Sequence, residues 1–347
     1  MNVILGIFLH AVGGFAAGSF YLPLKKIKEW AWESYWLING FISWIIMPWL
    51  VAFLTVPGLL SLYAEVSFLQ IFWPYFYGVL WGIGGLTFGL TMRYLGLSLG
   101  YALALGLTAM FGTIIPPIYF GEFFELLVLR SGLVTLAGIM ITLMGIALTG
   151  WAGFRKDNEV SEQEKRIGVK EFDLKKGIWV AVMAGIMSAC MAFGIQAGKP
   201  IADIAMANGT IPLFQNSPVF IVIFLGGFTS NFIWCVYLNI KNGTSSNYFD
   251  RSTPMLINYI FASLAGITWY LQFMFYGMGT SQMGDYEFAS WSIHFAFVIF
   301  FSNMWGLVTR EWKGVSKKTM RLIYLGLLVL VLSACIIGYG NYLSSFE

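Results

Sequence analysis

Two histidines are the side chains of this sequence best suited to proton chemistry. His10 and His294 are its only histidines, and each stands about eight residues inside a long apolar run. At a rise of about 1.5 Å per residue, both would lie roughly 12 Å from a helix end, toward the middle of a hydrocarbon core about 30 Å thick. Imidazole exchanges a proton near neutral pH, and ionisable groups at this depth are functional candidates. The alternative for each is a neutral histidine that hydrogen-bonds within the helix bundle.

An acidic residue precedes the second histidine at helical spacing. Glu287, Trp291 and His294 follow the spacing i, i+4, i+7 and would share one face of a helix. The carboxyl group would lie near the helix end and the imidazole about 10 Å deeper, which predicts an entry path for a proton. The alternative is that Glu287, like Asp285, is an ordinary acid at a helix N-terminus, where it favours the helix dipole.

Side chains suited to carbohydrate binding occupy a neighbouring helix. Asn258, Trp269, Gln272 and Tyr276 fall on one face of an apolar segment, and Lys199 stands at the end of another. Amides donate and accept hydrogen bonds as sugar hydroxyls require, and an indole face packs against the C–H side of a sugar ring. The alternatives are amides that hold helices together and a lysine whose ammonium extends to the membrane surface.

The sequence has no pattern that predicts catalysis or a metal site. It contains no P-loop, GxSxG, HExxH or CxxC motif, so we expect neither an enzyme nor transport driven directly by ATP. Cys190, Cys235 and Cys335 all fall inside apolar runs, where they predict packed or lipid-facing thiols.

The elements that must position these residues are membrane-spanning helices. Hydrophobic residues make up 58% and charged residues 11% of the 347 positions, whereas a soluble domain has roughly half and a quarter. The apolar runs are continuous, which favours helices over the alternating strands of a barrel. Windows long enough to cross a bilayer fall at 2–22, 34–56, 71–95, 97–119, 131–151, 177–198, 217–240, 255–278, 286–309 and 319–341. The predicted fold class is an all-α membrane protein with ten transmembrane helices.

The basic residues are concentrated in alternate connections between these windows. Eighteen of the 20 Lys and Arg residues fall in every second loop, and the other loops hold only Arg130 and Lys199. The positive-inside rule then predicts that the charged loops are cytoplasmic and that both termini lie outside.

A charged segment divides the chain near its midpoint. Residues 152–176 carry 13 charged side chains, seven basic and six acidic, and we predict a cytoplasmic linker between two five-helix halves, 1–151 and 177–347. Because five is odd, a repeated half must be inverted in the membrane. Sparse identities at an offset of 171 residues, such as Gly6 with Gly177, favour such a repeat. Inverted repeats are typical of transporters that work by alternating access.

Several segments together resemble one transporter family. GIFLHAVGGFAAGSFYLPLKKIKEWAWE, GLTMRYLGLSLG, EFDLKKGIWVAVMAGIMSA, WYLQFMFYG and YEFASWSIH are similar, in this order, to the bacterial L-rhamnose–proton symporter family of the drug/metabolite transporter superfamily. At Glu287 the family segment has an aspartate, so the carboxylate is kept but reaches one methylene further. The resemblance implies two inverted five-helix halves and the import of L-rhamnose with a proton. It also implies a central cavity lined by helices one, three, four, six, eight and nine.

The resemblance and the residues together lead to one expected function. We expect a proton-coupled importer of L-rhamnose or a closely related 6-deoxy-hexose, in a bacterial inner membrane, with the proton as coupling ion and no cofactor. Its expected partners are the sugar, the proton and the lipid bilayer, and no nucleic acid. The expected proton-coupling residues are His10, His294 and Glu287, and the expected substrate-binding residues are Gln272, Trp269, Trp291, Tyr276, Lys199 and Asn258. The alternatives are a drug or metabolite exporter of the same superfamily and a membrane sugar sensor that does not translocate.

Overall fold

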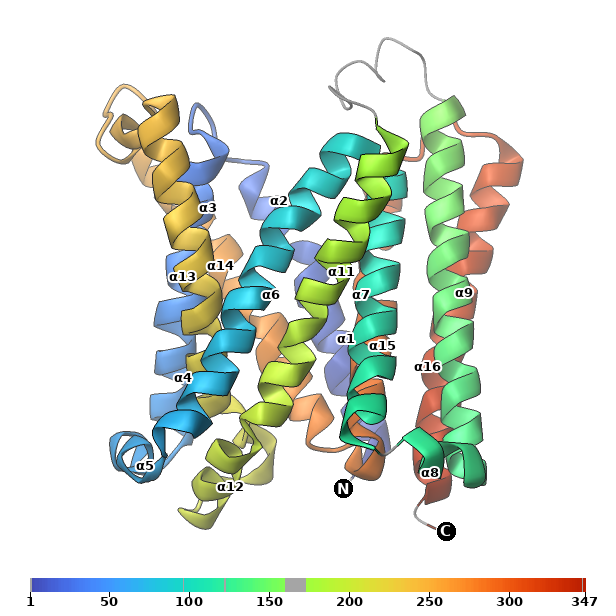
Figure 1. The fold of residues 1–347 in the computed structure, drawn as a ribbon. Helices are drawn as coiled ribbons and strands as arrows, with labels where there is room; N and C mark the ends of the chain where they lie inside the picture. Colours follow the sequence, from blue (N-terminus) through green and yellow to red (C-terminus); the bar gives the residue numbers. More distant parts are fainter. Residues whose placement is uncertain (1, 96, 122, 160–172, 345) are drawn as a thin grey trace.

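The computed structural model describes residues 2–95, 97–121, 123–159, 173–344 and 346–347, and within them every regular element is a helix (Figure 1). The first part contains α1 (Val3–Ser19), α2 (Tyr21–Leu24), α3 (Trp32–Gly40), the π-helical η1 (Phe41–Ile46), α4 (Met47–Thr55), α5 (Leu59–Glu65), α6 (Phe68–Leu95), α7 (Leu97–Phe120), α8 (Phe123–Val128) and α9 (Arg130–Glu159). The second part contains α11 (Leu174–Ala197), α12 (Lys199–Ala207), η2 (Pro212–Phe214), α13 (Ser217–Asn242), η3 (Ser245–Tyr248), α14 (Met255–Thr280), η4 (Gly284–Ala289), α15 (Ser290–Val308) and α16 (Lys317–Ser344). The all-helical prediction is confirmed for this part of the chain.

Each predicted apolar window falls on a helical segment, but the segments differ in how well they suit a membrane span. Among the described residues, eight segments are long and apolar enough to cross a bilayer. A ninth arises only if α5 and α6, which meet at a bend of 108°, form one span. The apolar part of α7, Leu103–Tyr119, is shorter. The count of ten spans therefore stays a prediction.

Side-chain caps begin the first helix of each predicted half. The Leu5 backbone N–H donates to Asn2 Oδ1 at 3.1 Å, and the Lys176 backbone N–H donates to Asp173 Oδ1 at 3.0 Å. Such caps satisfy N–H groups that have no partner inside the helix. The bond from Lys176 also holds the pKa of the Asp173 carboxyl below its usual range.

Helices from the two halves pack against one another. α1 lies against α14 and α15, α11 lies against α6 and α7, and α9 runs along α16 (Figure 1). Glycines permit the close approach, since a Cβ at Gly14 would overlap Phe297 of α15. A Cβ at Gly185 of α11 would likewise lie 2.6 Å from the Cβ of Leu107 in α7. Any larger residue at these positions would push the helices apart.

The described connections that are rich in Lys and Arg gather at one end of the bundle. The α2–α3 connection, the end of α13 and the α15–α16 connection lie at the top of Figure 1, whereas α5, α8, α12 and both termini lie at the bottom. Lys25 Nζ of the α2–α3 connection lies 3.0 Å from Glu311 Oε1 of the α15–α16 connection. Lys156 Nζ, near the end of α9, lies 5.0 Å from the ring centre of Trp312 in the same α15–α16 connection.

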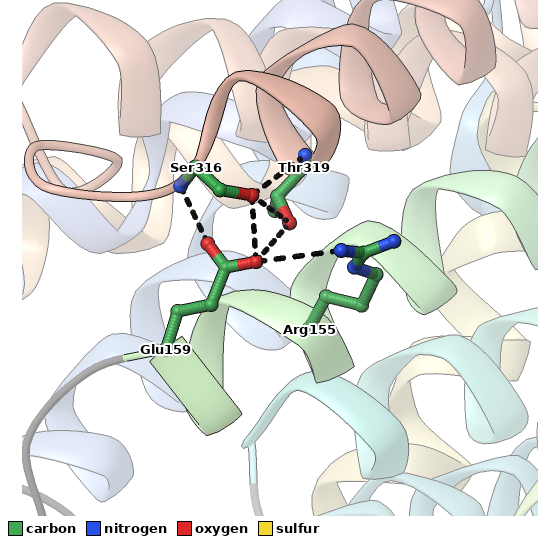
Figure 2. Close-up of polar contacts among 4 residues, drawn as sticks. All are labelled: Arg155, Glu159, Ser316 and Thr319. Atoms are coloured by element: carbon green, nitrogen blue, oxygen red, sulfur yellow. Dashed lines mark hydrogen bonds and ion pairs between the residues drawn. The ribbon is translucent and has the colours of Figure 1, made fainter.

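The helices beside the predicted linker extend into it. α9 continues through residues 152–159 and α11 begins at Leu174, while 160–172 lie outside the described residues. The last residue of α9, Glu159, reaches the start of α16 (Figure 2). Its carboxylate accepts hydrogen bonds from the Ser316 N–H at 2.6 Å, the Ser316 hydroxyl at 2.8 Å and the Thr319 hydroxyl at 2.6 Å. These bonds fix the ends of α9 and α16 to each other.

Candidate transport site

A cavity of about 570 Å³ lies among the helix ends on the side of the bundle that carries the termini. Its volume is within the range of small-molecule sites. Polar and aromatic side chains line it together with two prolines, and its lining includes Pro116, Pro117, Gln196, Lys199, Tyr276, Glu287 and Trp291. Of the six helices expected to line a central cavity, four contribute here, namely α7, α11, α14 and α15. Residues of α1 and α6 are not among the described lining, and the ends of α8, α9 and α16 take their place.

Trp291 is held rigidly at the inner wall of the cavity. Its indole Nε1 donates a hydrogen bond to the Thr108 carbonyl at 3.0 Å, and the side chain is 2% exposed. Gly112 of α7 makes room for it, because a Cβ there would overlap the indole. The Tyr276 ring stands edge-on to the indole, with ring centres 5.5 Å apart. Two of the predicted substrate-binding residues therefore form one aromatic corner of the cavity.

Glu287 and Lys199 both line the cavity, but they belong to different elements. Lys199 begins α12 and is exposed to the cavity. Glu287 lies in η4, a 3₁₀ helix, and α15 begins only at Ser290. The single α-helical face predicted for Glu287, Trp291 and His294 therefore does not form, because Glu287 lies in a 3₁₀ turn, which places side chains at a different angle from an α-helix. Glu287 and Trp291 line the cavity, whereas His294 does not.

The two histidines come together in the core. His10 of α1 is 0% exposed and His294 of α15 is 2% exposed, and their ring centres are 6.3 Å apart. Glycines leave room for both imidazoles. A Cβ at Gly279 would lie 2.9 Å from His10 Nε2, and a Cβ at Gly13 would lie 3.3 Å from His294 Cε1. Among the described residues, neither nitrogen of His10 and not Nδ1 of His294 has a hydrogen-bond partner.

Tyr276 separates the histidine pair from the cavity. Its ring centre lies 5.4 Å from that of His10 and 5.2 Å from that of His294, and the same residue lines the cavity. Whatever contacts Tyr276 from the cavity side is thus one ring away from both imidazoles.

Trp269 and Gln272 lie deeper along α14 than Tyr276. Trp269 is part of an aromatic cluster, with ring centres 5.4 Å from Trp44, 5.7 Å from Trp81 and 5.0 Å from Phe273. Gln272 is 8% exposed, and its amide makes no hydrogen bond with the described residues. Both were predicted to bind sugar, but neither lines the cavity.

Asn258 lies apart from this group, at the opposite end of α14. Its amide Nδ2 donates to the Lys28 carbonyl at 2.8 Å, and its Oδ1 accepts from the Lys28 N–H at 3.1 Å. Both polar atoms therefore hold the backbone before α3, and the structure does not bring Asn258 to the cavity.

Sequence reasoning left out part of the cavity wall. Gln196 stands one turn before Lys199 at i, i+3 spacing, which is a signal for a shared face. Pro116 and Pro117 lie within α7 and present a wall without N–H groups. Glu125 also lines the cavity and lies in α8, a short helix between the long helices α7 and α9. No sequence pattern predicts its place in the cavity, because the turn between these two long helices determines where α8 lies.

A bundle of apolar helices that encloses a polar cavity beside buried ionisable groups defines a membrane transporter as the class of protein. The chain matches the family model of the L-rhamnose-proton symport protein (RhaT) over residues 1–342. It belongs to this family of sugar–proton symporters, and it is a transporter rather than an enzyme.

Two curated relatives have the same name and match nearly the whole chain. They are L-rhamnose-proton symporters of Yersinia pestis and Yersinia pseudotuberculosis, each 39% identical over 342 residues, 97% of this chain and 98% of the relative. The predicted family is therefore confirmed.

Proposed function

We propose that this protein imports L-rhamnose, or a closely related 6-deoxy-hexose, together with a proton. The relatives' names state this substrate and this ion for those proteins. The observation that carries the proposal here is a polar cavity that a single aromatic ring, Tyr276, separates from two buried histidines. A sugar in the cavity and a proton on the histidines can then influence each other's binding, as coupled transport requires.

The cavity provides the groups that a deoxy-sugar needs. Gln196, Lys199 and Glu287 supply donors and acceptors for hydroxyl groups. Trp291 and Tyr276 offer aromatic surface to the C–H side of the ring. Pro116 and Pro117 give an apolar wall that suits the methyl group of a 6-deoxy-hexose. In this proposal Trp269 and Gln272 contact the sugar further along α14, once it moves past Tyr276.

The coupling proton binds at His10, His294 or Glu287. A neutral sugar carries no charge, so the proton alone couples its movement to voltage. One charge crossing about 100 mV is worth roughly 2.3 kcal/mol, which allows about a 45-fold accumulation before a pH gradient is counted.

The proposed mechanism is alternating access by two inverted five-helix halves, the plan of the drug/metabolite transporter superfamily. Positions 171 residues apart support the inversion. The N-caps of α1 and α11, Asn2 and Asp173, are such a pair, and their helices begin at opposite ends of the bundle (Figure 1).

The packing of matched glycines supports the same symmetry. Gly6 lies against the end of α14 and Gly177 against the end of α6, which are the third long helices of their halves. Gly14 lies against α15 and Gly185 against α7, which are the fourth. Each first helix thus meets the equivalent helices of the other half, as a two-fold axis in the membrane plane requires.

Uptake of labelled L-rhamnose into proteoliposomes tests the function. With the membrane potential clamped at zero, we expect accumulation only when the outside is more acidic, with collapse on addition of a protonophore. L-fucose, a 6-deoxy-hexose of different stereochemistry, and L-mannose, which differs from L-rhamnose only by its 6-hydroxyl, test the sugar. Uptake at a rate independent of the pH gradient would refute symport. Uptake driven by an acidic interior would favour the alternative of a drug or metabolite exporter.

A further inference from the structure

The charge state of the histidine pair is restricted by its surroundings. His10 and His294 lie on different helices with ring centres 6.3 Å apart, and both are buried. The groups packed around them are Tyr276 and Phe273 from α14, Phe295 from α15 and the backbone at Gly13 and Gly279. Tyr276 is the titratable group among these, and neither nitrogen of His10 nor Nδ1 of His294 has a hydrogen-bond partner among the described residues.

Two protons on this pair would repel each other. At an effective dielectric constant of about 20, unit charges at this separation weaken binding of a second proton roughly a hundredfold. Loss of hydration in a buried site adds to the penalty for a second charge. A single imidazolium avoids this repulsion, because the neighbouring ring then stays neutral.

We infer that His10 and His294 act as one site that holds a single proton, so that one proton moves with each sugar. The inference rests on the proposed function and adds its stoichiometry. Glu287 lies on the cavity side of Tyr276 and takes no second coupling proton in this scheme.

The ratio of protons to sugar is measured at zero flux. Proteoliposomes are loaded with labelled L-rhamnose, the membrane potential is clamped at zero with potassium and valinomycin, and the pH difference that stops net movement is found. For a tenfold sugar gradient, one proton per sugar requires a difference of about one pH unit, and two protons require about half a unit. We expect the value near one unit, and a value near half a unit overturns the inference.

Variants of the histidines give an independent test. His10→Gln and His294→Gln keep a polar side chain but remove the titrating group. With a shared proton, each single variant gives a ratio of one or zero, and the double variant gives zero. Ratios of two, one and zero for the wild type, the single variants and the double variant would show independent sites and overturn the inference. Accumulation by the double variant would overturn it as well.

Sugar counterflow, which needs no net proton movement, shows that each variant is folded. If a variant shows no counterflow, the proton-to-sugar ratio of the wild type at zero flux still tests the inference. Wild-type protein that exchanges L-rhamnose but shows no response to a pH gradient would refute the proposed symport itself, whereas gradient-driven uptake with a ratio of two would refute only the shared proton.

Discussion

Single glycines decide how closely the side chains of the site can approach one another. The indole of Trp291 fills the space that a Cβ would take at Gly112, and its hydrogen bond to the Thr108 carbonyl, 3.0 Å long, depends on this fit. Gly279 leaves room for His10 in the same way. The aromatic corner and the histidine pair therefore depend on backbone positions without side chains.

Gly112→Ala should displace the indole and distort the cavity. Overpacking of this kind costs about 1–3 kcal/mol, so we expect a lower unfolding temperature in detergent and at least a tenfold loss of L-rhamnose uptake. Gly106→Ala is the matched control on the same helix, because its Cβ would lie 3.4 Å from Ile146 Cγ2, an ordinary contact. Wild-type stability and uptake in Gly112→Ala would show that the indole position is not needed.

The burial of the two histidines could be predicted from the sequence, but their contact could not. Burial follows from their position inside long apolar runs, and each histidine is at most 2% exposed. The 6.3 Å separation of the rings depends on which helices are neighbours and how they are rotated. Asn258 illustrates the same limit, because helical spacing put it on the face of Trp269 although its partner, Lys28, belongs to a distant connection.

At the scale of elements, helix ends differ most from the predictions. The window 286–309 begins with a 3₁₀ turn, and α15 starts at Ser290. α9 extends beyond residue 151 to Glu159 because its last turn binds the start of α16. Hydrophobicity marks the part of a helix in lipid, but it gives no signal where polar caps and tertiary contacts set the boundary.

The contact between α9 and α16 should depend on pH. Hydrogen bonds from the Thr319 hydroxyl and then from Ser316, with a smaller effect of Arg155, lower the pKa of the Glu159 carboxyl to about 2 from 4.5. A lowered pKa in the folded state contributes stability above the unfolded value, and this contribution is lost as pH falls from about 4.5 to about 2. We expect Glu159→Gln to lose stability at neutral pH and to converge with the wild type in acid, measured by thermal unfolding in detergent.

Neighbouring residues provide controls for this contact. Thr319→Val removes a bond of 2.6 Å and should reduce the pH dependence clearly, whereas Arg155→Gln removes a charge at 3.7 Å and should reduce it little. Asp250 and Glu311 also have lowered pKa values, so the quantity to compare is the difference between each variant and the wild type. Equal pH dependence in Glu159→Gln and the wild type would contradict the assignment.

For the whole molecule, an all-helical bundle could be predicted because composition and continuous apolar runs leave few alternatives in lipid. The proposed repeat is faint in the sequence, where only sparse identities at an offset of 171 residues favour it. Packing adds support for it, because Gly14 lies against α15 and Gly185 lies against α7. The family resemblance implied a cavity and four of the helices that line it, but its position at the helix ends could not be predicted, because α8, α9 and α16 complete its wall there.

The orientation of the bundle leads to the last prediction. Basic connections and termini lie at opposite ends (Figure 1), and the positive-inside rule places the basic end in the cytoplasm. In a background without the three natural cysteines, Lys26→Cys and Lys313→Cys mark the basic end, and Arg130→Cys and Asn208→Cys mark the other; all four positions are exposed. A membrane-impermeant maleimide should label the second pair in intact cells and the first pair only after lysis.

Labelling of Lys26→Cys and Lys313→Cys from different sides would exclude the inverted arrangement, because both connections must follow an odd-numbered helix. Labelling of the first pair alone in intact cells would keep the arrangement but reverse its direction, so the cavity would then open to the cytoplasm and the proton would have to enter from the basic end.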